Sequence, residues 1–362
     1  MSKIVINQND PRTEKTESSI NKEMTDHILD KIKFHLSYYP EHDERLSEIM
    51  NEEIMDITEK EVFNEILKIG TDEDATCCAA NNPNCPPDAL AEVIRRGQND
   101  KVSRCVARNP SCPPEALAEV VGREIYSVSS CAAKNPNCPP EALAKVLRKR
   151  RNDSVSFCAE ENPNCPPEAL AEVLRRGKNN MVSWCAARNP NCPPEALAEV
   201  LRRGWINMVS CCAANNPNCP PDALAEVVRR GQDDKVSWCA ARNPNCLPEA
   251  LGEVLRRQEN DSVSCRAANN PNCPSEALAE VLRRGKDDMF SWCAAKNPNC
   301  PPEALAEVAR RVKDGVVTCC AAGNPNCPPE VLAEVLRRGK DDMVSCLAAE
   351  NPNRPQLRIQ DN

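Results

Sequence analysis

A repeat of 27 residues is the feature that most limits how this chain of 362 residues folds. The stretch SWCAARNPNCPPEALAEVLRRG at 183–204 has close copies along most of the sequence. One of its cysteines marks the period, with steps of 27 residues and a single step of 26, at Cys78, Cys105, Cys131, Cys158, Cys185, Cys212, Cys239, Cys293 and Cys320. Arg266 and Leu347 take this position in two further copies. Such a period predicts about ten stacked units, each packed only against its neighbours.

Each unit carries signals for two short helices. In CPPEALAEVLRRG at 192–204, proline suits the helix start, Leu197, Val200 and Leu201 form one apolar stripe, and Gly204 suits the position after the end. The other half, DDMFSWCAAKNP at 287–298, begins with aspartate as an N-cap and must end before Asn-Pro. Neither half can bury its apolar face alone, so the sequence predicts an all-α array of stacked short-helix pairs.

The pattern ARNPNCPPEALAEVLRRG resembles the leucine-rich repeat variant family, over about residues 61–355. The resemblance is specific, because the Asn-Pro-x-x-Pro-Pro-Glu-x-Leu core recurs about ten times. It implies a right-handed solenoid of paired short helices. The unit here is longer, with an insert around RRGKDDM. Some members of that family bind an iron–sulfur centre through an N-terminal cysteine cluster. Residues 1–76 hold no cysteine, so we expect no such cofactor here.

The segments outside the array differ from it in charge. We expect a disordered tail at 1–16, an acidic helical head at 17–60, the solenoid at 61–355 and a C-terminal tail at 356–362. Residues 1–60 hold 8 Lys/Arg and 14 Asp/Glu of a chain whose net charge is -8. The head either caps the first repeat or docks a partner. The sequence has no apolar run of membrane-spanning length and no secretory signal, which predicts a reducing, cytoplasmic location.

Two rows hold 19 of the 24 cysteines, and they invite three interpretations. The first row is the CAA cysteine of the period, and the second is the NPNC cysteine at the expected N-cap of the longer helix. Equivalent positions on stacked helices lie about 8–10 Å apart, too far for a disulfide or a zinc site within one row. All three histidines lie in the head, at His27, His35 and His42. We therefore favour packing over redox or metal chemistry and expect no cofactor, although a helix N-terminus can lower the pKa of an exposed NPNC thiol.

Comparison of the copies singles out the position before the CAA cysteine and the position four residues later. From 184 to 319 the first position alternates between tryptophan and cysteine, and each tryptophan there is followed at i+4 by arginine or lysine. Residues i and i+4 share one face of a helix, which predicts cation–π pairs on an exposed row. The alternative is neutral drift after duplication. The predicted partner-binding residues are Trp184, Arg188, Trp238, Arg242, Trp292, Lys296, Phe157, Arg104 and Arg108.

The sequence favours a non-catalytic scaffold that binds a protein partner through its stacked surface. It shows no nucleophile–base pair, no phosphate loop and no metal motif, so we expect no enzyme activity. A row of aromatic and polar side chains, one pair per helical repeat, is also typical of proteins that bind single-stranded nucleic acid. The net negative charge disfavours this alternative. Thiol-based redox or metal sensing is the third possibility.

Overall fold

The computed structural model describes residues 67, 73–97, 100–123, 125–149, 153–176, 181–204, 208–230, 235–257, 261–311, 315–338 and 343–355. The predicted segments 1–16, 17–60 and 356–362 lie outside this described part. Contacts divide the chain into two compact units, Met1–Pro166 and Pro167–Asn362. Helices α4 to α10 belong to the first unit, and helices α11 to α24 belong to the second. The described residues form helices joined by short turns and contain no strand.

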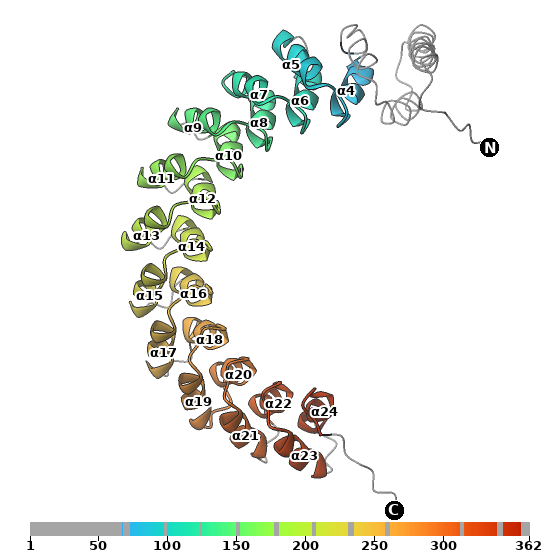
Figure 1. Cartoon of the computed structure of the whole chain (residues 1–362). Helices are drawn as coiled ribbons and strands as arrows, with labels where there is room; N and C mark the ends of the chain where they lie inside the picture. The colour runs from blue at the N-terminus through green and yellow to red at the C-terminus, as the bar shows by residue number, and fades with distance from the viewer. Residues whose placement is uncertain are drawn as a thin grey trace, which may run out of the picture. The chain divides into compact units, whose positions relative to one another are not determined.

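The odd-numbered helices are the proline-led halves of the repeats. In the second unit they form one row and the even-numbered helices form another (Figure 1). The odd-numbered helices are α5 (Pro87–Arg96), α7 (Pro114–Val121), α9 (Pro140–Arg148), α11 (Pro167–Arg175), α13 (Pro194–Arg202), α15 (Pro221–Arg229), α17 (Pro248–Arg257), α19 (Ser275–Arg283), α21 (Pro302–Arg310) and α23 (Pro329–Arg337).

The even-numbered helices carry the CAA motif. They are α4 (Glu73–Asn81), α6 (Asp100–Arg108), α8 (Tyr126–Lys134), α10 (Ser154–Glu161), α12 (Met181–Arg188), α14 (Met208–Asn215), α16 (Lys235–Arg242), α18 (Ser262–Asn269), α20 (Met289–Lys296), α22 (Val316–Gly323) and α24 (Met343–Glu350). The expected aspartate N-cap is confirmed at α20, where the Asp288 carboxylate accepts a hydrogen bond from the Ser291 N–H. Asp153 and Asp261 cap α10 and α18 in the same way.

Helix α13 shows how the proline-led halves begin and end. Pro194 is the first helical residue, and the N-cap is Pro193 in extended conformation with no side-chain cap. The expected position of the NPNC cysteine was therefore wrong by one residue, because the helix starts at the second proline and Cys192 precedes the cap. At the other end, Gly204 has a φ of 68°, the left-handed conformation in which a helix ends most readily on glycine.

The core is built from small and branched apolar side chains. Leu197 and Leu201 of α13 are buried, together with the matching leucine and valine side chains of the other proline-led helices. On the even-numbered helices the two alanines of the CAA motif are buried, as at Ala186 and Ala187 of α12. Because alanine has only a methyl group, neighbouring even-numbered helices can lie close together. This close approach determines which side chains of successive repeats meet.

Buried asparagines of the Asn-Pro turns tie each repeat to the one before it. Asn216 donates hydrogen bonds to the carbonyl oxygens of Ala187 at 2.8 Å and Asn189 at 2.9 Å, and its own Oδ1 accepts from the Asn218 N–H at 2.8 Å. The same three bonds recur at Asn109, Asn135, Asn162, Asn243, Asn270, Asn297, Asn324 and Asn351. Each side chain thereby satisfies backbone carbonyls that burial would otherwise leave unpaired.

The paired arginines at the end of the proline-led helices have a structural use. The second arginine reaches back one repeat, as where Arg203 Nη1 donates to the Leu174 carbonyl at 3.0 Å and Arg230 Nη1 donates to the Leu201 carbonyl at 3.2 Å. These carbonyls belong to the last turns of the preceding proline-led helix, where no intrahelical donor remains. The predicted all-α class and the stacked short-helix pairs are confirmed. Within the described residues, no helix has the length and apolar character needed to cross a membrane.

Candidate functional site

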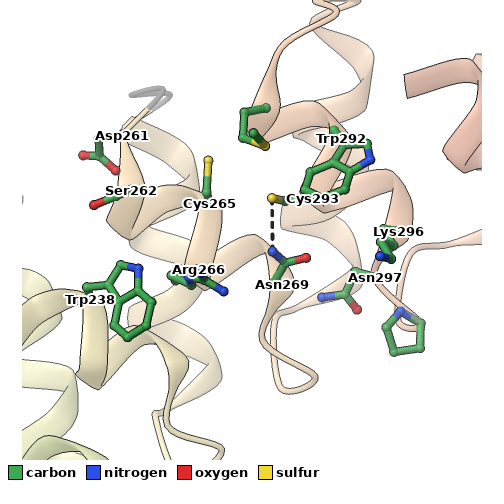
Figure 2. Close-up of a pocket in the computed structure, with 12 residues that line it drawn as sticks. Trp238, Asp261, Ser262, Cys265, Arg266, Asn269, Trp292, Cys293, Lys296 and Asn297 are labelled. Carbon is green, nitrogen blue, oxygen red and sulfur yellow. Dashed lines mark hydrogen bonds between the residues drawn. The ribbon is translucent and has the colours of Figure 1, made fainter. Parts of the chain in front are cut away.

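A groove of about 740 Å³ lies on the short-helix side of the second unit, along α16, α18 and α20. Figure 2 shows its walls, with Trp238 on one side and Trp292 and Lys296 on the other. Its lining includes two indoles, two cations, one amide and a thioether, from Trp238, Trp292, Arg266, Lys296, Asn269 and Met289. The groove therefore joins apolar and cationic groups from three successive repeats.

Trp238 lies against two guanidinium groups. The Cζ atom of Arg242, one turn further along α16, lies 5.5 Å from the centroid of the indole. The Cζ atom of Arg266 comes from the next repeat and lies closer, at 4.5 Å. Arg266 stands where most copies have the CAA cysteine. A guanidinium held over an indole keeps its edge available for a carboxylate or another planar acceptor.

Trp292 forms the opposite part of the lining. The Nζ atom of Lys296 lies 5.4 Å from its ring centroid. The indole of Trp292 also hydrogen-bonds the Cys320 thiol of the next repeat; burial raises the pKa of that thiol, and the indole offsets part of the rise. Met289, at the start of α20, is 58% exposed and adds a flexible apolar surface beside the indole.

The two cations of the groove have no carboxylate partner among the described residues. Neither Arg266 nor Lys296 forms an ion pair there, whereas Arg229 pairs with Glu253 at 2.9 Å and Arg203 lies 3.6 Å from Glu199. The Asp261 carboxylate also lines the groove, but it accepts the capping hydrogen bond from the Ser264 N–H at 2.6 Å. The groove thus presents positive charge to whatever enters it.

The predicted cation–π pairs form at two of the three tryptophans. Trp238–Arg242 and Trp292–Lys296 are confirmed as contacts. Trp238, Trp292 and Lys296 line the groove, whereas Arg242 does not. The structure gives no such contact between Trp184 and Arg188, although both residues are described. Instead, the indole of Trp184 and the Arg188 charge both act on Cys212 of the next repeat, whose pKa burial raises more than they lower it.

The remaining predicted site residues lie in the first unit. Phe157 is half-buried on α10, and Arg104 and Arg108 lie on α6, where Arg108 is exposed. The groove does not include them, and it does not include Trp184 or Arg188. That all nine predicted residues act as one binding row stays a prediction.

All ten NPNC cysteines are buried, which supports the expected packing role, because only exposed thiols of this row were expected to be reactive. Cys192 is 0% exposed, and burial raises its pKa to about 12. Burial also raises the pKa to about 12 for Cys85, Cys112, Cys138, Cys219, Cys246, Cys273 and Cys300 and to about 11 for Cys327. Desolvation of the thiolate outweighs the nearby helix terminus, so these side chains act as packing groups.

Three CAA cysteines behave in the opposite way. A hydrogen bond from the Cys77 thiol, followed by one from Asn81, lowers the pKa of Cys105 to about 6. Cys211 and Asn215 lower the pKa of Cys239 to about 7 in the same manner. The pKa of Cys293 is lowered by Cys265, by Asn269 and by the charges of Arg266 and Lys296. In each case the hydrogen-bond donors come from the preceding repeat. For Cys293, the Arg266 charge also comes from the preceding repeat, and the Lys296 charge comes from the same helix as Cys293.

These contacts were not predicted from the sequence, because they join non-equivalent positions of neighbouring repeats. Arg266, Asn269 and Met289 were not predicted as site residues either. Arg266 carried a signal, since it breaks the row of CAA cysteines directly after Trp238, and three of the cysteines before a CAA position have asparagine at i+4. Among the described residues, no group of three or more His, Cys, Asp or Glu side chains is arranged to hold a metal ion.

The comparisons with known proteins yield structural likenesses. No family model matches the chain, and no curated protein matches it. A solved structure described as a leucine-rich repeat variant with a novel repetitive structural motif is similar over 70% of this chain and 86% of its own, at 15% identity and a TM-score of 0.40.

Two engineered proteins are further matches. One has 16% identity and a TM-score of 0.12, covering 79% of this chain and 93% of its own. The other has 21% identity and a TM-score of 0.12, covering 79% of this chain and 95% of its own. The description of this fold rests on the helices and hydrogen bonds of the chain itself.

Proposed function

We propose that this protein is a non-catalytic scaffold, and that the α16–α18–α20 groove binds an acidic segment of a partner protein. The observation that carries the proposal is the pair of cations, Arg266 and Lys296, which are held over indoles and have no carboxylate partner among the described residues. Tryptophan and arginine together are typical of the residues that dominate protein interfaces.

The chemistry of the groove specifies the partner. Carboxylates of the segment pair with Arg266 and Lys296, and apolar side chains pack on Trp292 and the exposed Met289. The Asn269 amide, which also lines the groove, adds a polar group between the two cations. A short stretch that alternates acidic and apolar or aromatic residues fits this arrangement.

Single-stranded nucleic acid fits the same surface less well. Stacking of a base needs a free aromatic face, and the indole of Trp238 already lies against Arg242 and Arg266. A basic stripe is also weakened because the second arginine of several pairs is used for carbonyl contacts, as at Arg230 and Arg311. This supports an acidic protein segment over a phosphate backbone.

Selection from a random peptide display library on the full chain tests the proposal. We expect an enriched motif of acidic and aromatic residues, whose binding falls at least about tenfold when Arg266→Glu and Lys296→Glu are combined. The control variant combines Arg104→Glu and Arg108→Glu in the first unit. These two substitutions change the net charge by the same amount, but outside the groove.

Three results would contradict the proposal. They are the absence of an enriched motif, an equal loss of binding in the control variant, and tighter binding of a labelled single-stranded RNA than of the selected peptides. An equal loss in the control favours a binding row that extends over both units, and tighter RNA binding favours the nucleic-acid alternative.

A further inference from the structure

Three of the five cysteines that precede a CAA position lie against the CAA cysteine of the next repeat. This contact occurs between Cys265 of α18 and Cys293 of α20, which both line the groove and each shift the pKa of the other thiol. Asn269 Nδ2 also donates to Cys293 Sγ at 3.1 Å, and Figure 2 shows this bond between the two helices. The sulfur of Cys293 therefore receives a hydrogen bond from Asn269 of the preceding repeat, and the Cys265 thiol lies one helical turn from that asparagine.

The same arrangement occurs twice more. In the second unit, Cys211 and Cys239 form a pair, with Asn215 Nδ2 donating to Cys239 Sγ at 3.1 Å. In the first unit, Cys77 and Cys105 form a pair, and the contact from Asn81 Nδ2 is longer, at 3.6 Å. The combination of two cysteines and one asparagine that donates to the second cysteine therefore occurs at three contacts between repeats.

The tryptophan copies provide an internal contrast. Where Trp184 or Trp292 takes the position of the first cysteine, the facing thiol of Cys212 or Cys320 has no second thiol beside it in this arrangement, and its pKa is raised. The alternation of tryptophan and cysteine along the row thus also alternates two chemical environments for the CAA thiol.

We infer that Cys265 and Cys293 form a redox-active dithiol that a peroxide converts into a disulfide between α18 and α20, and that Cys211 and Cys239 form a second such pair. The inference rests on the facing thiols and their asparagine donors and does not depend on the proposed binding of a peptide. A pair of thiols in contact across two helices covalently joins successive repeats once it is oxidised.

The chemistry consists of two steps that consume one molecule of hydrogen peroxide. The Cys293 thiolate attacks one peroxide oxygen, the O–O bond breaks, and the leaving hydroxide takes up the thiol proton to form water and a sulfenic acid. Cys265 then attacks the Cys293 sulfur, the S–O bond breaks, and hydroxide leaves with the Cys265 proton as a second water. Two thiols and one peroxide give one disulfide and two waters.

Charge distributes these two roles between the cysteines. The positive charges of Arg266 and Lys296 favour the thiolate of Cys293. The pKa of Cys265 is raised by its interaction with Cys293 and by burial, with smaller contributions from Asp261 and Asp288. Cys293 is therefore the attacking thiolate and Cys265 the resolving thiol.

Access to the pair is through the groove. Both sulfur-bearing residues line it, with Cys265 half-buried and Cys293 1% exposed, so a small oxidant such as peroxide suits the site better than a bulky disulfide. The S–S bond of a disulfide is about 2.05 Å long, so its formation requires the half-buried Cys265 side chain to rotate toward the Cys293 sulfur.

Peptide mapping of the full chain after graded hydrogen peroxide tests the inference. Tryptic peptides 258–266 and 287–296 contain one cysteine each, so their linkage reports this disulfide alone. We expect the linked peptide to form at least about tenfold faster than oxidation of Cys320, which faces Trp292 instead of a thiol. Dithiothreitol should restore the two separate peptides.

Cys265→Ser is the matched variant, because Ser130 occupies the equivalent position in another repeat. With the resolving thiol removed, we expect the linked peptide to be absent and Cys293 to be labelled by a sulfenic-acid reagent. The inference is overturned if the exposed Cys346 and the Trp-facing Cys320 oxidise while peptides 258–266 and 287–296 stay unlinked. It is equally overturned if Cys293 forms no sulfenic acid in Cys265→Ser while its thiol is consumed at the same rate in the variant and in the unmodified chain.

Discussion

The Asn-Pro turns and the exposed side of the short helices lie in the same repeats, but their side chains meet different kinds of partner. Asn216 and its equivalents each bond the same backbone groups of the preceding repeat. Residues before the CAA position contact a side chain of the next repeat, and that side chain varies: Trp238 meets Arg266, and Cys265 meets Cys293.

The difference shows where the chain is free to change. A backbone carbonyl is present in every copy, so an asparagine that binds it fits every copy too. A side-chain partner differs between copies, and each change at the position before the CAA cysteine alters the chemistry of one joint only. The structure therefore separates a uniform set of buried asparagines, which holds the repeats together, from a variable row to which we assign the proposed binding and thiol chemistry.

The largest effect is expected when one of the buried asparagines of the Asn-Pro turns is removed. Asn243→Ala removes two hydrogen bonds, to the carbonyls of Ala214 and Asn216, and the acceptor for the Asn245 N–H. Leaving several buried groups unpaired should lower the free energy of unfolding by about 3 kcal/mol. Chemical denaturation of the full chain measures this loss.

The matched control for Asn243→Ala is Asn245→Ala, two residues away. Asn245 is exposed, and its side chain donates one hydrogen bond, to the Pro217 carbonyl. We expect a loss of about 1 kcal/mol or less. Equal losses for the two variants would show that the buried asparagine has no special role in joining the repeats.

An intermediate effect is expected from pH at Cys239. Its pKa is about 7 in the folded chain, because Cys211 and Asn215 stabilise the thiolate, against an ordinary value of about 9. Between these values the unfolded state binds more protons, so stability should rise with pH by up to about 2 kcal/mol from pH ~7 to ~9 and fall away below pH ~7.

Urea unfolding of the unmodified chain and of Cys239→Ala, measured across this pH range under argon with a reductant, isolates that contribution. The difference in unfolding free energy between the two proteins should grow with pH. Cys212→Ala is the control, since the pKa of Cys212 is raised. The difference in unfolding free energy between Cys212→Ala and the unmodified chain should not grow over the same pH range. A constant difference for Cys239→Ala would remove the evidence for a stabilised thiolate.

The smallest expected effect distinguishes the two arginines of one pair. Arg203 donates to the Leu174 and Arg175 carbonyls, at 3.0 and 3.3 Å, so Arg203→Ala should cost about 1 kcal/mol. Arg202 makes an exposed ion pair with Glu199, and Arg202→Ala should cost under about 0.5 kcal/mol. A thermal melt of both variants makes the comparison, and a reversed order would contradict the capping role of the second arginine.

Much of the fold was predictable because its signals are local. The proline-led start, the Leu197, Val200 and Leu201 stripe and the left-handed Gly204 each act within one helix or turn. The aspartate N-caps were predictable for the same reason. Of the candidate site, the sequence identified Trp238 and Trp292 with their i+4 cations, since residues one turn apart on a helix always share a face.

The contacts between repeats were not predictable, because they depend on the distance and rotation between neighbouring helices. Buried alanines bring successive short helices close enough for Cys265 to reach Cys293 and for Arg266 to cover Trp238. The Asn-Pro pair was interpreted only as a helix stop, since nothing in one copy shows that its amide bonds carbonyls of the preceding repeat.

The sequence by itself determined that the chain is a tandem array of short-helix pairs, because periodic apolar positions and helix-end residues operate within a single unit. Only the tertiary structure decided which thiols are inert and which face another thiol, and where cations lie over indoles. The physical reason is that pKa values and cation–π contacts depend on neighbours from the adjacent repeat, 24 to 28 positions away in the sequence for these pairs.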